Sequence, residues 1–194
     1  MVRGGVVVHL AGASMSLETE YNRVASEPSD IVEHLPKFVA MVHELDAQHV
    51  IELGTRTGVS TIAWLHALES TGGRLTSIDI DEAPPIGTYP HWTFIQSDDL
   101  APAVVSSLDE ADIVFIDTSH LYAQTIQELH TYRWLVRSGG LLVLHDTELP
   151  MPETALPGEP RFPVKKAVME FIRDTGFEYI IHPECWGLAI IKVV

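Results

Sequence analysis

The sequence has little cysteine and no long apolar run. Cys185 is the single cysteine among 194 residues, which excludes an intrachain disulfide framework and a zinc site built from several cysteines. No apolar segment approaches the ~20 residues that a membrane-spanning helix needs. We therefore expect a cytoplasmic protein that does not enter a membrane. Residues 1–16, with one arginine before a short apolar stretch, are predicted to be a loose extension ahead of one domain over residues 17–194.

Positive charge is also scarce. The chain has 12 Lys and Arg against 27 Asp and Glu, a formal net charge of −15. Because non-specific affinity for nucleic acid comes mainly from Lys and Arg contacts to phosphates, nucleic acid is excluded as an expected partner. An acidic surface suits a cationic ligand or a metal ion, although it also serves solubility alone.

Apolar runs that end in polar residues alternate with amphipathic segments along the chain. The predicted strands are residues 49–54, 74–80, 92–96, 112–117 and 140–146, and two further runs at 177–182 and 187–194 predict a closing β-hairpin. This alternation predicts an α/β fold with a mostly parallel sheet, helices on both faces and ligands at the carboxyl ends of the strands. The hairpin adds one antiparallel strand.

Helices are predicted between these strands from their apolar faces and end signals. Ser29 or Asp30 is expected to cap a helix whose apolar face includes Phe38, and Gly58 to begin the next helix. Thr118 or Ser119 is expected to cap a helix that runs to Val136 and ends at Gly139, and Pro163 and Gly176 to bound the last helix.

The turn E52-L-G-T-R-T-G58 joins the first predicted strand to a helix. Glycine has no Cβ and accepts positive φ, so the backbone of this turn can approach a ligand closely. A dinucleotide fingerprint needs a second glycine where Arg56 stands, which disfavours a nicotinamide cofactor. Asp79 ends the second strand near the ~20-residue offset at which an acidic side chain meets ribose hydroxyls. The segment Q96-S-D-D99 supplies an Asp for an adenine amino group, so the set predicts a nucleoside site.

The ordered set E52-L-G-T-R-T-G58, S77-I-D79, Q96-S-D98 and F115-I-D117, followed by the hairpin, resembles the class I S-adenosylmethionine-dependent methyltransferases. The resemblance covers nearly the whole chain after about residue 28. It implies a Rossmann-like sheet of seven strands in the order 3-2-1-4-5-7-6, with strand 7 antiparallel. It also implies S-adenosylmethionine as cofactor, with Gly54 near its methionine half, Asp79 on the ribose and Asp98 on the adenine. The candidate cofactor-binding residues are Glu52, Gly54, Thr55, Arg56, Gly58, Ser60, Asp79, Asp98 and Asp117.

Two further segments, I116-D-T-S-H120 and L144-H-D-T147, follow the fourth and fifth predicted strands. Because the tips of adjacent parallel strands meet at one edge, Asp117, Asp146 and Thr147 are candidate oxygen ligands for Mg²⁺ or another divalent cation. In the alternative, Asp117 caps the following helix and Asp146 orders the next loop. The pair is similar to the metal site of catechol-type O-methyltransferases, in which an Asn stands in the place of Thr147.

Methylation of an alcohol needs a base near the oxygen, a Lewis acid on it, or both. The resemblance puts His120 at the position of the lysine that serves as base in the catechol-type enzymes. Neutral imidazole accepts a proton at cellular pH, so His120 is a candidate base. His145 is the second candidate, as base or as a group that orients the substrate.

The acceptor is suggested only by resemblance. Residues 28–36 and 119–129 look like those of tailoring methyltransferases for sugars and macrolide glycosides. This implies a sugar or glycoside acceptor, with 1-O-methylation of short 3-O-methylmannosides in polysaccharide biosynthesis as the closest single activity, and favours a homodimer. The proline-rich residues 148–162 are interpreted as an acceptor lid or a surface excursion. An NAD(P)-dependent oxidoreductase, opposed by Arg56 and the hairpin, and a non-catalytic S-adenosylmethionine-binding protein are the alternative functions.

Overall fold

The computed structural model describes residues 16–151, 158 and 160–194. The predicted extension therefore lies outside the described residues except for Ser16, whose hydroxyl oxygen accepts a hydrogen bond from the Thr19 amide and caps the first helix. The helices are α1 (Leu17–Ser26), the 3-10 helix η1 (Val32–His34), α2 (Leu35–Leu45), α3 (Val59–Glu69), α4 (Pro102–Val105), α5 (Tyr122–Tyr132) and α6 (Pro163–Thr175). None of the helices in the described part of the chain has the length and hydropathy of a membrane span.

Seven strands form one sheet. They are β1 (His49–Leu53), β2 (Arg74–Asp79), β3 (Trp92–Gln96), β4 (Ala111–Ile116), β5 (Val136–His145), β6 (Glu178–His182) and β7 (Leu188–Lys192). Their order is β3-β2-β1-β4-β5-β7-β6, and β7 is antiparallel to both of its neighbours, which confirms the predicted topology. Leu53 pairs with Ile78 on one side and with Ile116 on the other, and Ile116 pairs with Leu144. The carboxyl ends of β2, β1, β4 and β5 therefore meet at one edge.

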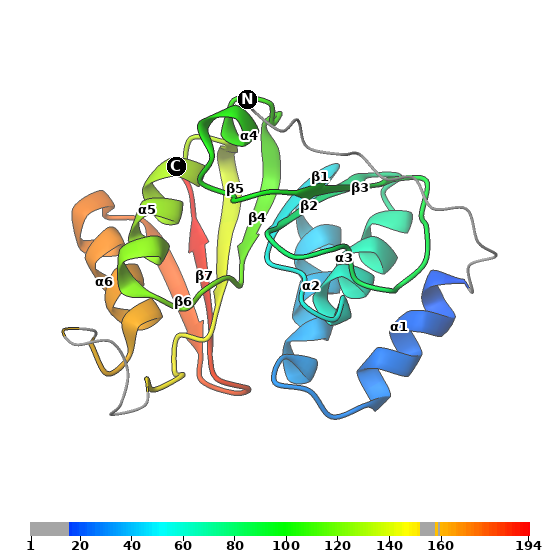
Figure 1. The fold of residues 1–194 in the computed structure, drawn as a ribbon, viewed down its shortest axis with the longest axis horizontal. Coiled ribbons are helices and arrows are strands. Elements are labelled where there is room, and N and C mark those ends of the chain that lie inside the picture. Colours follow the sequence, from blue (N-terminus) through cyan, green and yellow to red (C-terminus); the bar gives the residue numbers. More distant parts are fainter. Residues whose placement is uncertain (1–15, 152–157, 159) are drawn as a thin grey trace.

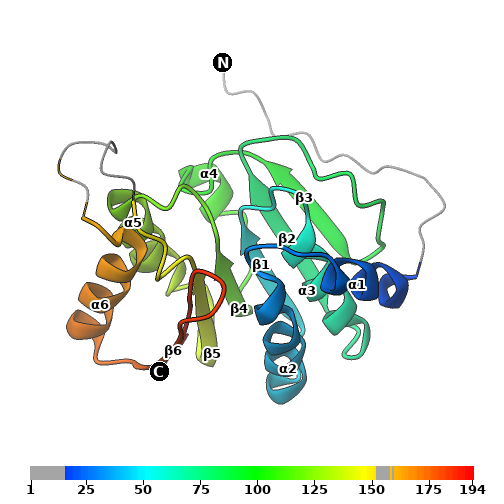
Figure 2. The ribbon, with the colours of Figure 1, turned by 90° about the horizontal axis from the view of Figure 1, so that it is seen from below.

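Helices cover both faces of the sheet, with α1, α2 and α3 on one side and α5 and α6 on the other (Figures 1 and 2). The alternation of side chains along β1 explains this, since Val50 packs into the apolar cluster under α1–α3 while Ile51 and Leu53 pack into the cluster under α5 and α6. Both clusters are buried, as expected for parallel strands covered on two sides.

The predicted helix beginning near residue 29 is wrong in its start. The segment instead forms η1 and then α2, whose N-cap residue His34 makes no side-chain cap hydrogen bond. The physical reason is that the Asp30 carboxylate is engaged elsewhere, by the guanidinium of Arg56 at 2.6 Å. The predicted apolar face is nevertheless buried, with Phe38 fully enclosed.

The helix predicted after residue 118 is also wrong at both ends. It begins at Tyr122 without a side-chain cap, because the Thr118 hydroxyl donates to Glu128 instead of capping the helix. It ends at Tyr132, and Val136 and Gly139 belong to β5, where Val136 pairs with Ala111 of β4. Helices α1 and α4 were not predicted. In contrast, the closing hairpin and the bounds of α6 are confirmed, with Gly176 at φ 70° directly after α6.

The predicted acceptor lid, residues 148–162, is described only in part. Residues 152–157 and 159 lie outside the described residues, so the lid stays a prediction. At its start, the Glu148 carboxylate accepts a hydrogen bond from Lys165 of α6 at 2.6 Å.

Candidate functional site

The turn after β1 brings the backbone of two strands unusually close. Gly54 has φ +85°, and a Cβ on it would lie 1.9 Å from the carbonyl oxygen of Asp117 at the tip of β4. Only glycine allows this approach, because any larger residue would overlap backbone atoms. Gly58, at φ +83°, begins α3, and a Cβ there would lie 2.5 Å from Ile86. Both glycines therefore allow close packing within the protein, Gly54 against Asp117 and Gly58 against Ile86, and Gly54 also lines the cavity described below.

Glu52 lies beneath this turn and is fully buried. Its carboxylate accepts hydrogen bonds from the hydroxyls of Ser60 at 2.7 Å, Thr61 at 2.9 Å and Ser77 at 2.6 Å. Burial raises the pKa of Glu52 to about 7, although the three hydroxyl donors oppose this shift. Glu52 thus ties β1 to α3 and β2 and supports the turn from below, outside the cavity described next.

A cavity of about 470 Å³ opens at the carboxyl ends of the strands. This volume is in the range of small-molecule sites. Of the predicted site residues, it is lined by Gly54, Thr55, Arg56, Ser60, Asp79, Asp98, Asp117 and His120. The other predicted site residues, Glu52, Gly58, His145, Asp146 and Thr147, lie behind the wall or beside it. The residues that line the cavity come from five separate segments, which the shared edge of the sheet brings together.

Asp79 is held by the turn opposite to it. One of its oxygens accepts hydrogen bonds from the Thr55 amide at 2.7 Å, the Thr55 hydroxyl at 3.0 Å and the Arg56 amide at 3.3 Å. The other oxygen accepts from the Asp81 amide at 3.0 Å. Burial alone would raise the pKa of Asp79, but these donors outweigh burial and lower it. Asp79 is therefore an anion fixed in the cavity wall.

Asp98 and Asp99 also line the cavity, and Asp99 forms with Glu128, which lies behind the wall, a buried acidic pair that sequence reasoning missed. Burial, together with the charge of Asp99, raises the pKa of Glu128 to about 8, and burial raises the pKa of Asp99 as well. Glu128 accepts hydrogen bonds from Thr118 at 2.7 Å and from Gln124 at 2.8 Å, and both of these residues line the cavity. Glu128 thus holds this part of the wall. Its one sequence signal is an acidic residue on the apolar stripe of α5.

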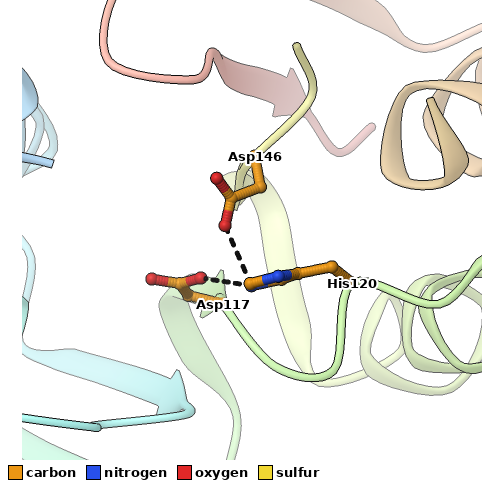
Figure 3. A group of neighbouring side chains, drawn as sticks. All are labelled: Asp117, His120 and Asp146. Atoms are coloured by element: carbon orange, nitrogen blue, oxygen red, sulfur yellow. Dashed lines mark hydrogen bonds and ion pairs between the residues drawn. The ribbon is translucent and has the colours of Figure 1, made fainter. Parts of the chain in front are cut away.

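Asp117, His120 and Asp146 form a cluster beside the cavity (Figure 3). The His120 Nε2 atom lies 3.2 Å from Asp117 Oδ1 and 2.9 Å from Asp146 Oδ2. Among the described residues, these three side chains are the group of His, Cys, Asp and Glu ligands close enough to hold one metal ion. The predicted convergence of Asp117 and Asp146 at one edge is present. Thr147 is fully buried, and its hydroxyl oxygen has no hydrogen-bond partner among the described residues and lies towards Gly187.

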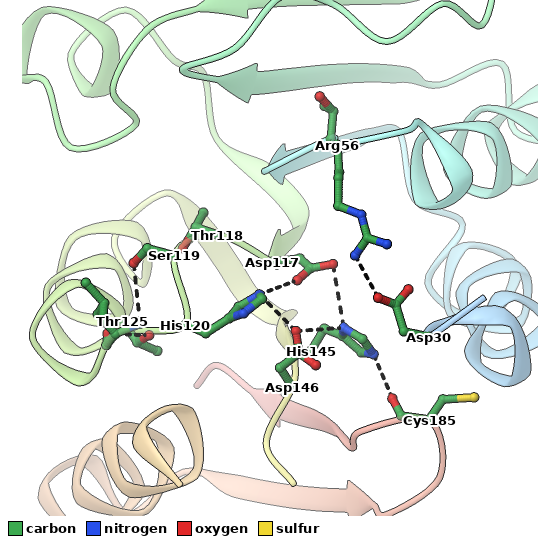
Figure 4. A network of polar contacts seen from close by, with 12 residues as sticks. Asp30, Arg56, Asp117, Thr118, Ser119, His120, Thr125, His145, Asp146 and Cys185 are labelled. Atoms are coloured by element: carbon green, nitrogen blue, oxygen red, sulfur yellow. Dashed lines mark hydrogen bonds and ion pairs between the residues drawn. The ribbon is translucent and has the colours of Figure 1, made fainter. Parts of the chain in front are cut away.

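His145 joins the same cluster from the tip of β5 (Figure 4). Its Nδ1 atom lies 3.3 Å from Asp146 Oδ2 and 3.6 Å from Asp117 Oδ2. Its other ring nitrogen, Nε2, lies 2.8 Å from the carbonyl oxygen of Cys185 in the β6–β7 turn. The side chain is only 1% exposed, whereas the side chain of His120 is 31% exposed and lines the cavity. Of the two candidate bases, His120 is the one that a ligand in the cavity can reach.

The electrostatics of the cluster follow from its two carboxylates. Burial alone would lower the pKa of both imidazoles, but Asp117 and Asp146 outweigh it and raise the pKa of His120 to about 9 and that of His145 to about 10. Burial alone would raise the pKa values of Asp117 and Asp146, but the two histidines lower both. The carboxylates are therefore ionised, and positive charge is required next to them.

Backbone strain gathers around this cluster. Positive φ values occur at His120 (57°), Asp146 (62°), Cys185 (43°) and Trp186 (63°), none of which is glycine. Such conformations cost about 1–3 kcal/mol each and persist where the surrounding structure imposes them. Arg56, at φ 43°, adds a fifth case in the turn after β1, at the position where a dinucleotide fingerprint has glycine. The strain is consistent with a functional site at these strand tips.

Comparison with known families and structures agrees with this geometry. A family model described as a methyltransferase domain matches residues 51–147, half of the chain, from β1 to the residue after Asp146. Comparison with curated proteins found no significant match.

Solved structures of similar fold include three that hold S-adenosylmethionine (SAM) or its demethylated product S-adenosylhomocysteine (SAH). TomG, an O-methyltransferase of tomaymycin synthesis from Streptomyces achromogenes in complex with SAM, is 14% identical, with a TM-score of 0.67 over 93% of this chain and 91% of that one. An O-methyltransferase from Bacillus cereus in complex with SAH is 16% identical, with a TM-score of 0.64 over 93% and 92%. MycE, a methyltransferase of the mycinamycin pathway in complex with Mg, SAH and mycinamycin VI, is 16% identical, with a TM-score of 0.68 over 93% of this chain and 55% of that one.

Proposed function

The chain belongs to the methyltransferase-domain family, and we propose that it is an enzyme that transfers the methyl group of S-adenosylmethionine to a hydroxyl oxygen of a small molecule. The observation that carries this proposal is a juxtaposition. The cavity with the fixed Asp79 anion on its wall is also lined by Asp117 and His120, so a ligand in it would lie beside a carboxylate and an accessible imidazole. The second carboxylate, Asp146, lies 2.9 Å from that imidazole. The solved structures of similar fold that bind SAM or SAH support the same cofactor here.

The cofactor supplies a methyl group on a positively charged sulfonium, which leaves as a neutral thioether when the acceptor oxygen takes the methyl carbon. The acidic wall suits this charge. In this proposal Asp79 would accept hydrogen bonds from the ribose hydroxyls, and exposed Asp98, 19 residues further along the chain, would accept one from the adenine amino group. Gly54, Thr55 and Ser60 line the cavity from the turn after β1 and the start of α3, and the methionine part would lie beside Gly54, which packs against the backbone of Asp117.

The donor atoms at the tips of β4 and β5 fit a divalent cation. Two ionised carboxylates from neighbouring strands lie together, and the buried Nδ1 atom of His145 aims at both without a hydrogen-bond partner in the described structure. Asp117 and Asp146 would hold such an ion, with Thr147 as the third predicted oxygen ligand. When bound, the ion supplies Lewis acidity that makes an acceptor hydroxyl easier to deprotonate.

His120 is the proposed base. It lines the cavity, it is the more exposed of the two histidines, and the carboxylates of Asp117 and Asp146 at the strand tips hold its imidazole at 3.2 and 2.9 Å. Its Nε2 atom would take the proton that leaves the acceptor hydroxyl. A cation on Asp117 and Asp146 would neutralise the charge that now raises the pKa of His120, which frees the imidazole to accept that proton.

The test combines binding with turnover. Calorimetry with S-adenosylhomocysteine is expected to detect binding, and transfer of a labelled methyl group to an acceptor panel is expected to fall about 10²–10⁴-fold in the His120→Gln variant while S-adenosylhomocysteine still binds. His130→Gln, an exposed histidine on α5 away from the cavity, is the matched control and should transfer at the wild-type rate. Absence of binding by the wild-type protein would overturn the cofactor assignment, and full activity of His120→Gln would overturn the base.

The acceptor is proposed to be a sugar or glycoside, with short 3-O-methylmannosides as the first compounds to assay for 1-O-methylation. The MycE structure, which holds mycinamycin VI together with Mg and SAH, supports a small-molecule acceptor for a protein of this fold. A sugar diol offers two oxygens to one ion, which suits a cluster at the cavity end. We also propose that the enzyme acts in the cytoplasm and that residues 17–194 form one domain. The enzyme is further proposed to be a homodimer, which sedimentation of the purified chain would test.

A further inference from the structure

The orientation of the His145 ring is fixed by the fold. His145 is the last residue of β5, pairs with Leu188 of β7, and is 2% exposed. Its Nε2 atom lies 2.8 Å from the Cys185 carbonyl oxygen, which can only accept a hydrogen bond. Nε2 must therefore carry the hydrogen. The ring of His34 packs edge-on against it, with the two ring centroids 5.7 Å apart.

This assignment leaves Nδ1 with a lone pair in the neutral ring. The atom is buried, has no hydrogen-bond partner in the described structure, and faces Asp146 Oδ2 at 3.3 Å and Asp117 Oδ2 at 3.6 Å. Carboxylate oxygens that are ionised cannot donate a hydrogen bond to it. In the neutral ring, three electron-rich atoms would therefore point at one another inside the protein, so the group needs either a proton on Nδ1 or a bound cation among them.

The spacing of these atoms matches that of ligands around one metal ion. Two ligands that are each bound at ~2.1 Å lie ~3.0 Å apart at a right angle and ~3.4 Å apart at a tetrahedral angle. The measured separations of 3.3 and 3.6 Å fall close to these values. The hydrogen bond from Nε2 to a backbone carbonyl is also the contact that usually orients a histidine that ligates a metal through its other nitrogen.

We propose that His145 binds the catalytic cation through Nδ1, together with Asp117 and Asp146, and that this nitrogen makes the site selective for a transition metal such as Mn²⁺, Fe²⁺, Co²⁺ or Zn²⁺ over Mg²⁺. The inference rests on the cation site of the proposed function and names the metal class that it takes. Imidazole suits transition metals, whereas Mg²⁺ favours carboxylate, carbonyl and water oxygens. His145 is too enclosed to act as the base, so its role differs from that of His120.

The direct test is nuclear magnetic resonance of the full chain labelled with ¹⁵N in histidine. Two-bond ¹H–¹⁵N spectra distinguish the two ring nitrogens, and His145 is assigned as the signal that is lost in His145→Gln. Addition of Zn²⁺ to the wild-type protein is expected to shift Nδ1 of His145 while Nε2 keeps its hydrogen. A zinc-bound protein in which His145 still carries hydrogen on both nitrogens would overturn the proposal.

Affinity gives a second measurement. Calorimetry is expected to show Co²⁺ binding at least about 100-fold tighter than Mg²⁺ to the wild-type protein, and His145→Gln is expected to lose at least about tenfold in Co²⁺ affinity with little change for Mg²⁺. Glutamine retains an amide donor for the Cys185 carbonyl but lacks the imidazole lone pair. His130→Gln should bind both ions like the wild type. An unchanged ratio of Co²⁺ to Mg²⁺ affinity in folded His145→Gln would overturn the proposal.

Failure of this inference is separable from failure of the proposed function. Binding of S-adenosylhomocysteine and methyl transfer are measured without reference to the nitrogen spectra. Methyl transfer with Mg²⁺ as the best ion, and no shift of His145, would reject the nitrogen ligand and keep the methyltransferase. If Zn²⁺ shifts the Nδ1 signal of His145 but S-adenosylhomocysteine does not bind, the nitrogen ligand is kept and the methyltransferase is rejected.

Discussion

Replacement of Gly54 by alanine is expected to disrupt the site from the inside. The new Cβ would lie 1.9 Å from the Asp117 carbonyl oxygen, so the tips of β1 and β4 must separate by more than about 1 Å to restore an ordinary contact. Positive φ adds about 1–2 kcal/mol for a residue with a Cβ, and overpacking in a tight interior adds about 1–3 kcal/mol. The total of about 2–5 kcal/mol is a large share of the stability of a domain.

Gly72 provides the matched control, because it has a similar φ of +70° but nothing within 4 Å of the position of its Cβ. Gly72→Ala should therefore cost only the backbone term of about 1–2 kcal/mol and leave the binding of S-adenosylhomocysteine intact. Urea unfolding and calorimetry of both variants measure the difference. If Gly54→Ala is no less stable than Gly72→Ala and binds S-adenosylhomocysteine like the wild type, the close approach of the two strands is not what requires glycine.

Two other changes test the support of the cavity. Glu52 has a pKa of about 7 in the fold against 4.5 in the unfolded chain, so its protonated form stabilises the fold below pH 4.5 and this contribution is lost as pH rises through 7. Relative to the wild type, Glu52→Gln should therefore gain about 2–3 kcal/mol in unfolding free energy between pH 5 and pH 8, and equal pH dependence of both proteins in urea unfolding would contradict the burial argument. Asp79→Asn should weaken binding of S-adenosylhomocysteine about 10–100-fold in calorimetry, because a charged hydrogen-bond acceptor is lost. The control Asp174→Asn, on the exposed end of α6, should bind like the wild type. Equal affinities of the two variants would show that Asp79 does not contact the cofactor.

Much of the architecture was predictable because the strand signals are local. Apolar runs such as those of β1, β2 and β4 end in turn or polar residues, and a parallel sheet forces their carboxyl ends to one edge. Asp79 and Asp117 were therefore identified from their places directly after apolar strands. The signals failed where side chains found distant partners, as when Asp30 paired with Arg56 and Thr118 with Glu128 instead of capping helices.

The roles of several site residues depended on contacts that no local pattern reports. Glu52 is the clearest case, since the sequence motif suggested a ligand contact and the fold buries the side chain among three hydroxyls from α3 and β2. The Asp99 and Glu128 pair was likewise invisible, because 29 residues separate its members in the chain.

The sequence by itself determined the strands, the glycine turn after the first strand and the residues that stand at the strand tips, because periodicity and backbone freedom are properties of short segments. The order of the strands was implied by the family resemblance. Only the tertiary structure decided which of the two candidate histidines faces the cavity. The β6–β7 turn brings the Cys185 carbonyl to His145 and encloses that ring, while His120 stays on the cavity wall. Burial and the direction of a ring nitrogen arise from contacts between distant segments, which exist only once the chain has folded.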